Sequence, residues 1–326
     1  MPEVRERVDP VTLQVVANAL ASIADEMATT IFRTAHSTVV RDGMDFSAAL
    51  LDARGETVSQ AVSVPFHLGS IPVAMERLLE RYGGSMAPGD VFLMNDPFDG
   101  GIHLQDLFVF KPVHLGAELI GFAATTAHHG DVGGRLPGSS ACDNTEIFQE
   151  GIRLPWLRLY AAGEPVEDVF KIVAANVRIP RMTLGDLGAQ VAACTVAERA
   201  LLALAGRHGT AGLAALMEAL IDHTERLVRA AYLVAEGTSS AIVQQIKNDS
   251  RTPDYGNLIT ALASTKQLNG IQAQCKVLHD SRCTFSEIPH AGKQADAATM
   301  TTARTCFVEL AKVSVGTLQT HHRSGT

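Results

Sequence analysis

The stretch from Leu107 to Ala127, LFVFKPVHLGAELIGFAATTA, limits the choice of fold more than any other part of the chain. It contains two apolar runs separated by a short segment at 115–117, a pattern that predicts two antiparallel strands and a tight turn. With the turn there, residues whose numbers sum to about 233 stand opposite each other. Asp106 then faces about Ala127, beside His128, so the two free ends of the hairpin meet at one edge of a sheet.

Polar residues that suit a metal ion lie at that edge. GGIHLQDLF supplies His103 and Asp106, and TTAHHGDVGG supplies His128. Upstream, RDGMDFSAAL places Asp45 directly before another apolar run, with Asp42 as the competing choice. Two imidazoles and two carboxylates suit zinc, manganese or iron(II) better than calcium or magnesium. A buried histidine is often only a hydrogen-bonded core residue, so these residues alone leave a metal site and a structural role both open.

Further polar side chains near these stretches are candidates for orienting ligands or moving protons. They are His129, Asp131 and Glu146. His67, in PFHLGS, either lines the same pocket or packs in the core. The flanking glycines, at positions 100, 101, 133 and 134, are expected to let backbone approach an ion and a substrate closely.

The remaining patterns predict an α+β fold, with a mainly antiparallel sheet and long helices packed on it. Asp9-Pro10 is a helix start, and apolar residues then recur every three or four positions to about residue 34. The other expected elements are helices over 71–84, 184–206 and 211–235, a hairpin around 52–55, a strand in DVFLMNDPF, and extended loops over 130–165.

Composition changes near Gly237. Residues 1–236 hold 18 Lys and Arg against 29 Asp and Glu, whereas residues 237–326 hold 9 against 6 and have weak periodicity. The change predicts a metal-bearing domain over 1–236 and a poorly structured, unrecognised segment over 237–326.

Charge and composition exclude several classes of protein. The net charge is −8 with no basic block, which argues against nucleic acid as the main partner. No run approaches the roughly 18 apolar residues of a membrane helix, and the charged N-terminus, MPEVRERVDP, does not resemble a signal peptide, so a cytoplasmic location is expected. The five cysteines form no CxxC pair, and no P-loop or dinucleotide fingerprint is present. The chain is therefore not expected to bind ATP by those motifs.

Several longer stretches, in order along residues 8–235, resemble the hydantoinase B/oxoprolinase family. They are FRTAHSTVVRDGMDFSAALLDARGETVSQ, VPFHLGSIPVAM, NDPFDGGIHLQDLFVFKPV, AHHGDVGG, NTEIFQEGIRLP and LGDLGAQVAA. The resemblance implies that the metal-binding motif of the family falls on Asp45, His103, Asp106 and His128 of this sequence.

The resemblance also implies an activity and a partner. Family members work with a hydantoinase A-type subunit, which has an actin-like ATP-binding fold, so a hetero-oligomer is expected. The partner uses ATP to activate a cyclic amide such as a hydantoin, 5-oxoproline or another lactam. This chain would hold one divalent transition metal (Zn, Mn or Fe) and open the ring by metal-assisted hydrolysis.

Two alternatives stay open. The first is a subunit of an ATP-dependent ketone carboxylase, as related family members are. Product formation from a ketone that depends on bicarbonate would distinguish such a carboxylase from a hydrolase. Family members are also usually longer than this chain. The second alternative is therefore a truncated, non-catalytic remnant that at most binds a partner.

Overall fold

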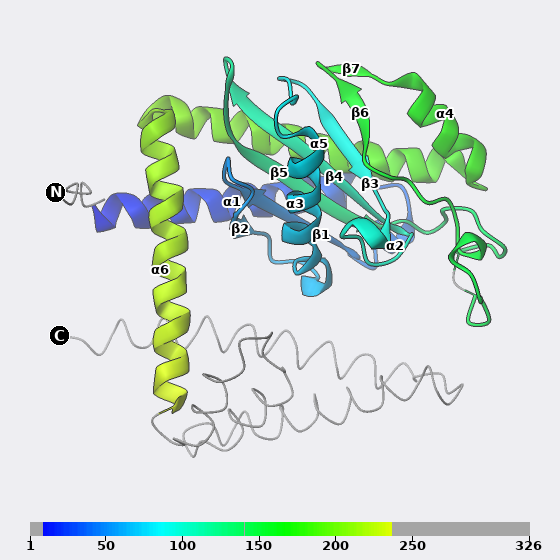
Figure 1. The fold of residues 1–326 in the computed structure, drawn as a ribbon, viewed down its shortest axis with the longest axis horizontal. Helices are drawn as coiled ribbons and strands as arrows, with labels where there is room; N and C mark the ends of the chain where they lie inside the picture. Colours follow the sequence, from blue (N-terminus) through cyan, green and yellow to red (C-terminus); the bar gives the residue numbers. More distant parts are fainter. Residues whose placement is uncertain (1–8, 140, 237–326) are drawn as a thin grey trace. The chain divides into compact units, whose positions relative to one another are not determined.

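The computed structural model describes residues 9–139 and 141–236, and Figure 1 shows their arrangement. At the centre is a seven-stranded sheet with the strand order β2-β1-β5-β4-β3-β6-β7. Every neighbouring pair is antiparallel, which confirms the predicted α+β class. The strands are β1 (Phe46–Leu51), β2 (Thr57–Gln60), β3 (Val91–Met94), β4 (Asp106–Leu115), β5 (Glu118–His128), β6 (Leu157–Ala161) and β7 (Glu164–Pro165).

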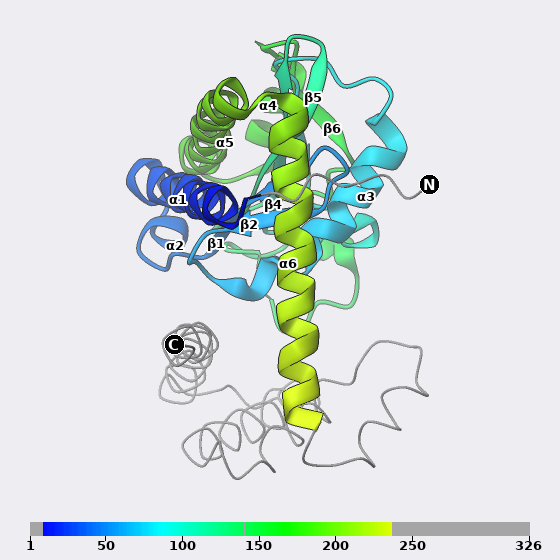
Figure 2. The same ribbon diagram turned by 90° about the vertical axis from the view of Figure 1, so that its left-hand side faces the viewer.

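Helices cover both faces of this sheet. Figure 2 shows α1 and α5 on one side of the strands and α3 on the other. The helices are α1 (Pro10–Thr34), α2 (Thr38–Arg41), α3 (Ser70–Tyr82), α4 (Glu167–Asn176), α5 (Pro180–His208) and α6 (Thr210–Glu236). Short 3₁₀ turns lie in the connections, namely η1 (Pro65–His67), η2 (Pro97–Asp99) and η3 (Ile147–Gln149).

The strands separate two apolar cores. Leu107 and Val109 of β4 belong to the larger core, under α1 and α5, whereas Phe108 and Phe110 belong to the smaller core, under α3. This alternation follows from the pleat of the strand, in which successive side chains point to opposite faces. β4 is therefore apolar on both faces, which explains its continuous hydrophobic run.

The first helix follows the sequence closely. The Asp9 side chain accepts a hydrogen bond of 2.9 Å from the backbone N–H of Thr12, which caps the helix before Pro10. The buried face consists of apolar residues, most of them three or four positions apart as predicted: Val16, Leu20, Ile23, Ala24, Met27 and Ile31. The predicted helix is confirmed.

The central hairpin contains a bulge that the sequence reading missed. Next to the turn, Leu115 pairs with Glu118, as predicted. Further along, Val113 pairs with Gly121, so Ile120 is an extra residue on β5. Such an insertion moves every later pair in the ladder by one residue.

The bulge decides which residues share a face at the end of the hairpin. Asp106 pairs with His128, not with Ala127 as predicted. Directly opposed residues of an antiparallel pair point to the same face, and a shift of one residue exchanges the faces. Without the bulge, Asp106 would share its face with Ala127, and His128 would point into the opposite core.

Some strands and helices lie where the sequence predicted loops, and one helix begins earlier than predicted. β6 and β7 fall within 130–165, where extended loops were expected, and β6 pairs with β3. α4 was not predicted. α5 begins at Pro180 rather than at 184, because proline is well tolerated in the first turn of a helix.

By length and composition alone, α1 and α5 resemble membrane-spanning helices. In the structure they pack against each other, and α5 also packs on β4 and β5. Their buried residues, such as Leu20 and Leu201, belong to the larger core. Core packing therefore accounts for their apolar composition.

The chain divides into two compact units, Met1–Thr224 and Glu225–Thr326. The sheet and helices α1 to α5 belong to the first unit. The prediction of a poorly structured segment over 237–326 lies outside the described residues. The predicted domain boundary near Gly237 stays a prediction.

The glycines around the predicted site pack closely against the chain itself. Gly100 has φ +102, and a Cβ there would lie 2.7 Å from the backbone nitrogen of Ala74 in α3. Gly101 likewise approaches the carbonyl of Asp96, Gly133 that of Asn176, and Gly134 that of Glu150. These glycines therefore serve backbone-to-backbone packing, and the expectation that they let backbone approach an ion and a substrate stays a prediction.

We expect Gly100→Ala to lower the free energy of unfolding by at least about 2 kcal/mol, because it adds left-handed strain to a backbone clash. Urea unfolding followed by circular dichroism measures this change. Gly84→Ala is the control, since no atom lies within 4 Å of its added Cβ. Equal stability of the two variants would contradict the packing described for Gly100.

Candidate metal centre

The candidate site forms where three strand ends meet. Asp106 is the first residue of β4, and its partner His128 is the last residue of β5. Asp45 immediately precedes β1, and its carbonyl accepts a hydrogen bond of 2.9 Å from the backbone N–H of His128. Asp106 and His128 are spaced by two and four residues from Phe108 and Ala124, which lie in the core under α3. The alternation of side chains therefore directs them to the α3 face.

The Asp106 carboxylate is the centre of the cluster. It is fully buried, and each of its oxygens faces an imidazole. His128 Nδ1 lies 2.7 Å from Oδ1, and His103 Nδ1 lies 3.0 Å from Oδ2. The backbone N–H of His103 also donates to Oδ2, at 3.1 Å. The three predicted residues are thus brought together, with one ligand atom each within 4.8 Å of the others.

Electrostatics favour the charged carboxylate despite its burial. Burial alone would raise the pKa of Asp106, but hydrogen bonds from His103 and His128 outweigh it and hold that pKa well below its usual range. The hydrogen bond to Asp106 raises the pKa of His103 against the effect of its partial burial. The negative charges of Asp45 and Glu150 act in the same direction.

A third imidazole, from His67 at the end of η1, completes the ring of polar groups. It is almost fully buried, with 1% of its surface exposed. Its Nε2 lies 3.5 Å from Asp106 Oδ1 and 3.9 Å from Asp45 Oδ1. The sequence left this residue open between lining the pocket and packing, and the structure places it against the predicted ligands.

The structure distinguishes Asp45 from Asp42, the two aspartates that the sequence offered as the fourth ligand. The Asp45 side chain is 39% exposed and faces His67. Asp42 instead pairs with Arg41 at 2.9 Å and lies exposed at the surface. Met44, between them, has φ +53, an uncommon conformation that turns the chain into β1. This geometry favours Asp45.

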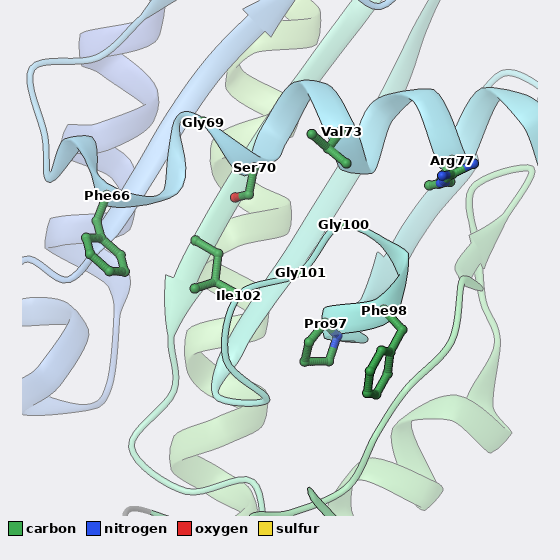
Figure 3. Close-up of a pocket in the computed structure, with 10 residues that line it drawn as sticks. All are labelled: Phe66, Gly69, Ser70, Val73, Arg77, Pro97, Phe98, Gly100, Gly101 and Ile102. Atoms are coloured by element: carbon green, nitrogen blue, oxygen red, sulfur yellow. The ribbon is translucent and has the colours of Figure 1, made fainter. Parts of the chain in front are cut away.

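An open pocket of about 480 Å³ adjoins the cluster. Figure 3 shows its walls, formed by the start of α3 and the turn around η2. Phe66 lines the pocket and stacks on His103, with ring centroids 6.1 Å apart and planes inclined by 14°. The other lining residues are mainly apolar or glycine: Gly69, Ser70, Val73, Arg77, Pro97, Phe98, Gly100, Gly101 and Ile102.

The donor set fits a transition metal. Imidazole nitrogens and carboxylate oxygens that converge on one point are typical ligands of zinc, manganese and iron(II). His103 is half exposed and His128 is one-quarter exposed, so the cluster can be reached from solvent. The residues that converge closely enough to hold one ion are His103, Asp106 and His128, and Asp45 lies beside them, facing His67.

Comparison with known proteins identifies the family. The family model described as hydantoinase B/oxoprolinase matches residues 9–285, which include all of these site residues. This chain belongs to the hydantoinase B/oxoprolinase family. The match extends beyond Gly237, into residues that the structure does not describe.

Relatives of this hydantoinase B/oxoprolinase chain include enzymes named for cyclic amides. The beta chain of the caprolactamase of Pseudomonas jessenii is 38% identical over 223 residues, which are 68% of this chain and 38% of that protein. The B component of a putative D-/L-hydantoinase from Pseudomonas sp. (strain NS671) is 32% identical over 229 residues, 69% of this chain and 39% of that protein. The chain therefore spans about two fifths of the length of these relatives.

Solved structures share the fold. The crystal structure of ATP-dependent caprolactamase from Pseudomonas jessenii matches with a TM-score of 0.64 and 36% identity, covering 69% of this chain and 39% of that one. A nucleotide-free acetone carboxylase structure matches with a TM-score of 0.61 and 22% identity, covering 67% and 29%. At that identity the second match shows the fold alone.

In this family member, His129 lies on the opposite face of the sheet from His128. Its Nε2 lies 2.9 Å from Gln190 Oε1 of α5, and the Gln190 amide donates to the Leu107 carbonyl at 2.8 Å. Burial lowers the pKa of His129, so its ring stays neutral and donates to Gln190. The structure thus places this acid–base candidate in a buried link between α5 and the two strand ends.

The other two acid–base candidates also make contacts elsewhere. Asp131 pairs with Arg178 Nη1 at 2.7 Å and accepts the backbone N–H of that residue at the same distance. Glu146 is exposed, and its backbone N–H donates to Gln149 in the turn at η3. Among the hydrogen bonds and ion pairs of residues 9–139 and 141–236, none joins either side chain to the cluster.

Sequence reasoning missed several contributors to this candidate metal centre. Gln190 lies on the buried face of a long Ala- and Leu-rich helix, where a polar residue is the signal for a buried hydrogen bond. The negative charge of Glu150 raises the pKa of His103. Glu150 lies in a loop, where no periodic pattern predicts which way its side chain points. His67 was not among those missed, because the sequence analysis left open whether it lines the pocket or packs in the core.

We expect Gln190→Leu to lower the free energy of unfolding by about 1–3 kcal/mol, because it leaves the buried N–H of His129 without an acceptor. Urea unfolding measures the change. Gln14→Leu is the matched control: the same substitution at an exposed position of α1 should change stability by less than about 0.5 kcal/mol. Wild-type stability of Gln190→Leu would refute the buried link.

Proposed function

We propose that this chain is the metal-bearing part of an enzyme that opens a cyclic amide, such as a lactam, a hydantoin or 5-oxoproline, after ATP-dependent activation. The observation that carries the proposal is the convergence of His103 and His128 on the buried Asp106, with Asp45 beside them. Named relatives that act on such rings support the choice of substrate class.

The pocket beside the cluster is the proposed place for the ring. Its volume of about 480 Å³ suits a small cyclic amide. Phe66 and Ile102 supply apolar walls next to His103, and the guanidinium of Arg77 lies at the far end, as Figure 3 shows. The ring would lie on the apolar walls with its amide turned toward the cluster.

Charge and access at the cluster suit a hydrolytic role. A divalent ion bound there would act as a Lewis acid and lower the pKa of a water molecule. Asp106 orients the imidazoles through two hydrogen bonds, and the half-exposed His103 faces the pocket through Phe66. His129, Asp131 and Glu146 stay proposals for acid–base steps, although their contacts in this structure lie away from the cluster.

An ATP-using partner is part of the proposal. The sequence contains no P-loop, and relatives are named as the beta or B members of multi-chain enzymes, one of them in a structure titled an ATP-dependent caprolactamase. A hydantoinase A-type subunit would supply the activated amide. The cytoplasmic location expected from the sequence stays a prediction.

We expect the purified chain to bind about one zinc, manganese or iron ion, and His103→Ala and His128→Ala to weaken binding by at least about a hundredfold. Elemental analysis and competition with a chromophoric chelator measure this. His223→Ala, at an exposed position of α6, should bind like the wild type. A wild-type chain that holds no metal after reloading would overturn the metal centre.

We expect ring opening of caprolactam, hydantoin or 5-oxoproline only when an A-type partner and ATP are both present. Asp106→Asn should reduce the rate at least about a hundredfold, because the central charge is lost. Chromatography of the opened amino acid measures turnover. Ring opening without ATP would disprove the coupled mechanism, and bicarbonate-dependent product from a ketone would instead establish the carboxylase alternative.

A further inference from the structure

We propose that His67 is a further metal ligand, through Nε2, and that Ser47 fixes its tautomer. This inference rests on the proposed metal centre and adds a third imidazole to it. It follows from the hydrogen-bond partners of one buried ring.

The proton on Ser47 determines which nitrogen of His67 carries a hydrogen. Ser47 lies on β1, and its hydroxyl donates to the Val64 carbonyl at 2.6 Å. A hydroxyl has one proton, so its oxygen can only accept from a second partner. That partner is His67 Nδ1, at 3.2 Å, which must therefore carry the hydrogen. In the neutral ring, the lone pair then lies on Nε2.

Nε2 of His67 faces negative charge. Its nearest partners among the described residues are Asp106 Oδ1 at 3.5 Å and Asp45 Oδ1 at 3.9 Å. A lone pair directed at two carboxylates is repulsive unless a positive charge lies between them. All three atoms are acceptors, which is the arrangement that a cation requires.

The three imidazoles lie at different distances from the Asp106 carboxylate. His128 and His103 approach the same carboxylate to 2.7 and 3.0 Å, as hydrogen-bond donors do. His67 stays at 3.5 Å from the very oxygen that His128 contacts. The separation at His67 is longer than the roughly 2.7–3.2 Å of an N–H···O hydrogen bond.

The same distances suit ligands of one ion. Donor atoms about 2.1 Å from a metal lie about 3.0–4.2 Å apart, depending on the bond angle. Both separations of His67 Nε2 fall in this range. The imidazole is also held in place, because the Ser70 hydroxyl donates to the His67 carbonyl at 2.7 Å and Phe66 meets the ring edge to face.

The test separates a ligand from a residue that only packs. His67→Asn retains a polar atom near the position of Nδ1, and so the contact with Ser47, but has no counterpart of Nε2. Ser47→Ala retains the imidazole but removes the acceptor that fixes its tautomer. His223→Asn is the exposed control, and thermal unfolding without metal shows whether each variant folds.

We expect His67→Asn to fold and to bind zinc at least about a hundredfold more weakly than wild type, and Ser47→Ala to lose about tenfold to a hundredfold. X-ray absorption at the zinc edge should show three imidazoles in the wild type and two in His67→Asn. The wild-type spectrum decides the question even if the variant does not fold.

Three outcomes would overturn the inference. Two imidazoles in the wild type, or unchanged zinc affinity in a folded His67→Asn, would leave the proposed metal centre standing and remove only His67 from it. A wild-type chain that binds no zinc would remove both. The two failures are therefore distinguishable.

Discussion

The buried charge of Asp106 is the constraint on which the site depends. A carboxylate removed from water costs several kcal/mol unless hydrogen-bond donors or cations surround it. Here the hydrogen-bond donors come from two separate segments, the turn before β4 and the end of β5, and His67 from the connection before α3 lies against the same carboxylate. Each segment must be held in place for the charge to be tolerated, so folding and assembly of the site are one event.

One face of the sheet carries the cluster, and the other face carries the contacts that hold the two strand ends in place. The α3 face carries the cluster and its pocket, whereas on the α1 and α5 face Gln190 ties Leu107 to His129. These two residues directly follow Asp106 and His128 in the sequence. A polar side chain of α5 therefore holds the two strand ends from the face opposite the cluster.

The sequence predicted most of the elements that depend on periodicity, although α4 was missed. The long helices, the central hairpin and the convergence of His103, Asp106 and His128 all follow from alternating or helical patterns. It failed where local geometry decides. The bulge at Ile120 changed the register, and its only signal was Gly121 within a strand. Glu150 was missed and His67 was left open, because no repeat in their irregular segments tells which way a side chain points.

The bulge at Ile120 also shows that the site depends on whether the number of residues in each strand of the hairpin changes by an odd or an even number. An odd number of residues added to or removed from one strand between the turn and the strand ends would turn one ligand toward the opposite core, whereas an even number would keep both on one face. The hairpin is therefore expected to tolerate amino-acid substitutions in its strands more readily than the insertion of a single residue. Relatives that keep Asp106 and His128 as ligands are therefore expected to differ in the length of this hairpin by equal changes in both strands or by an even number of residues in one strand.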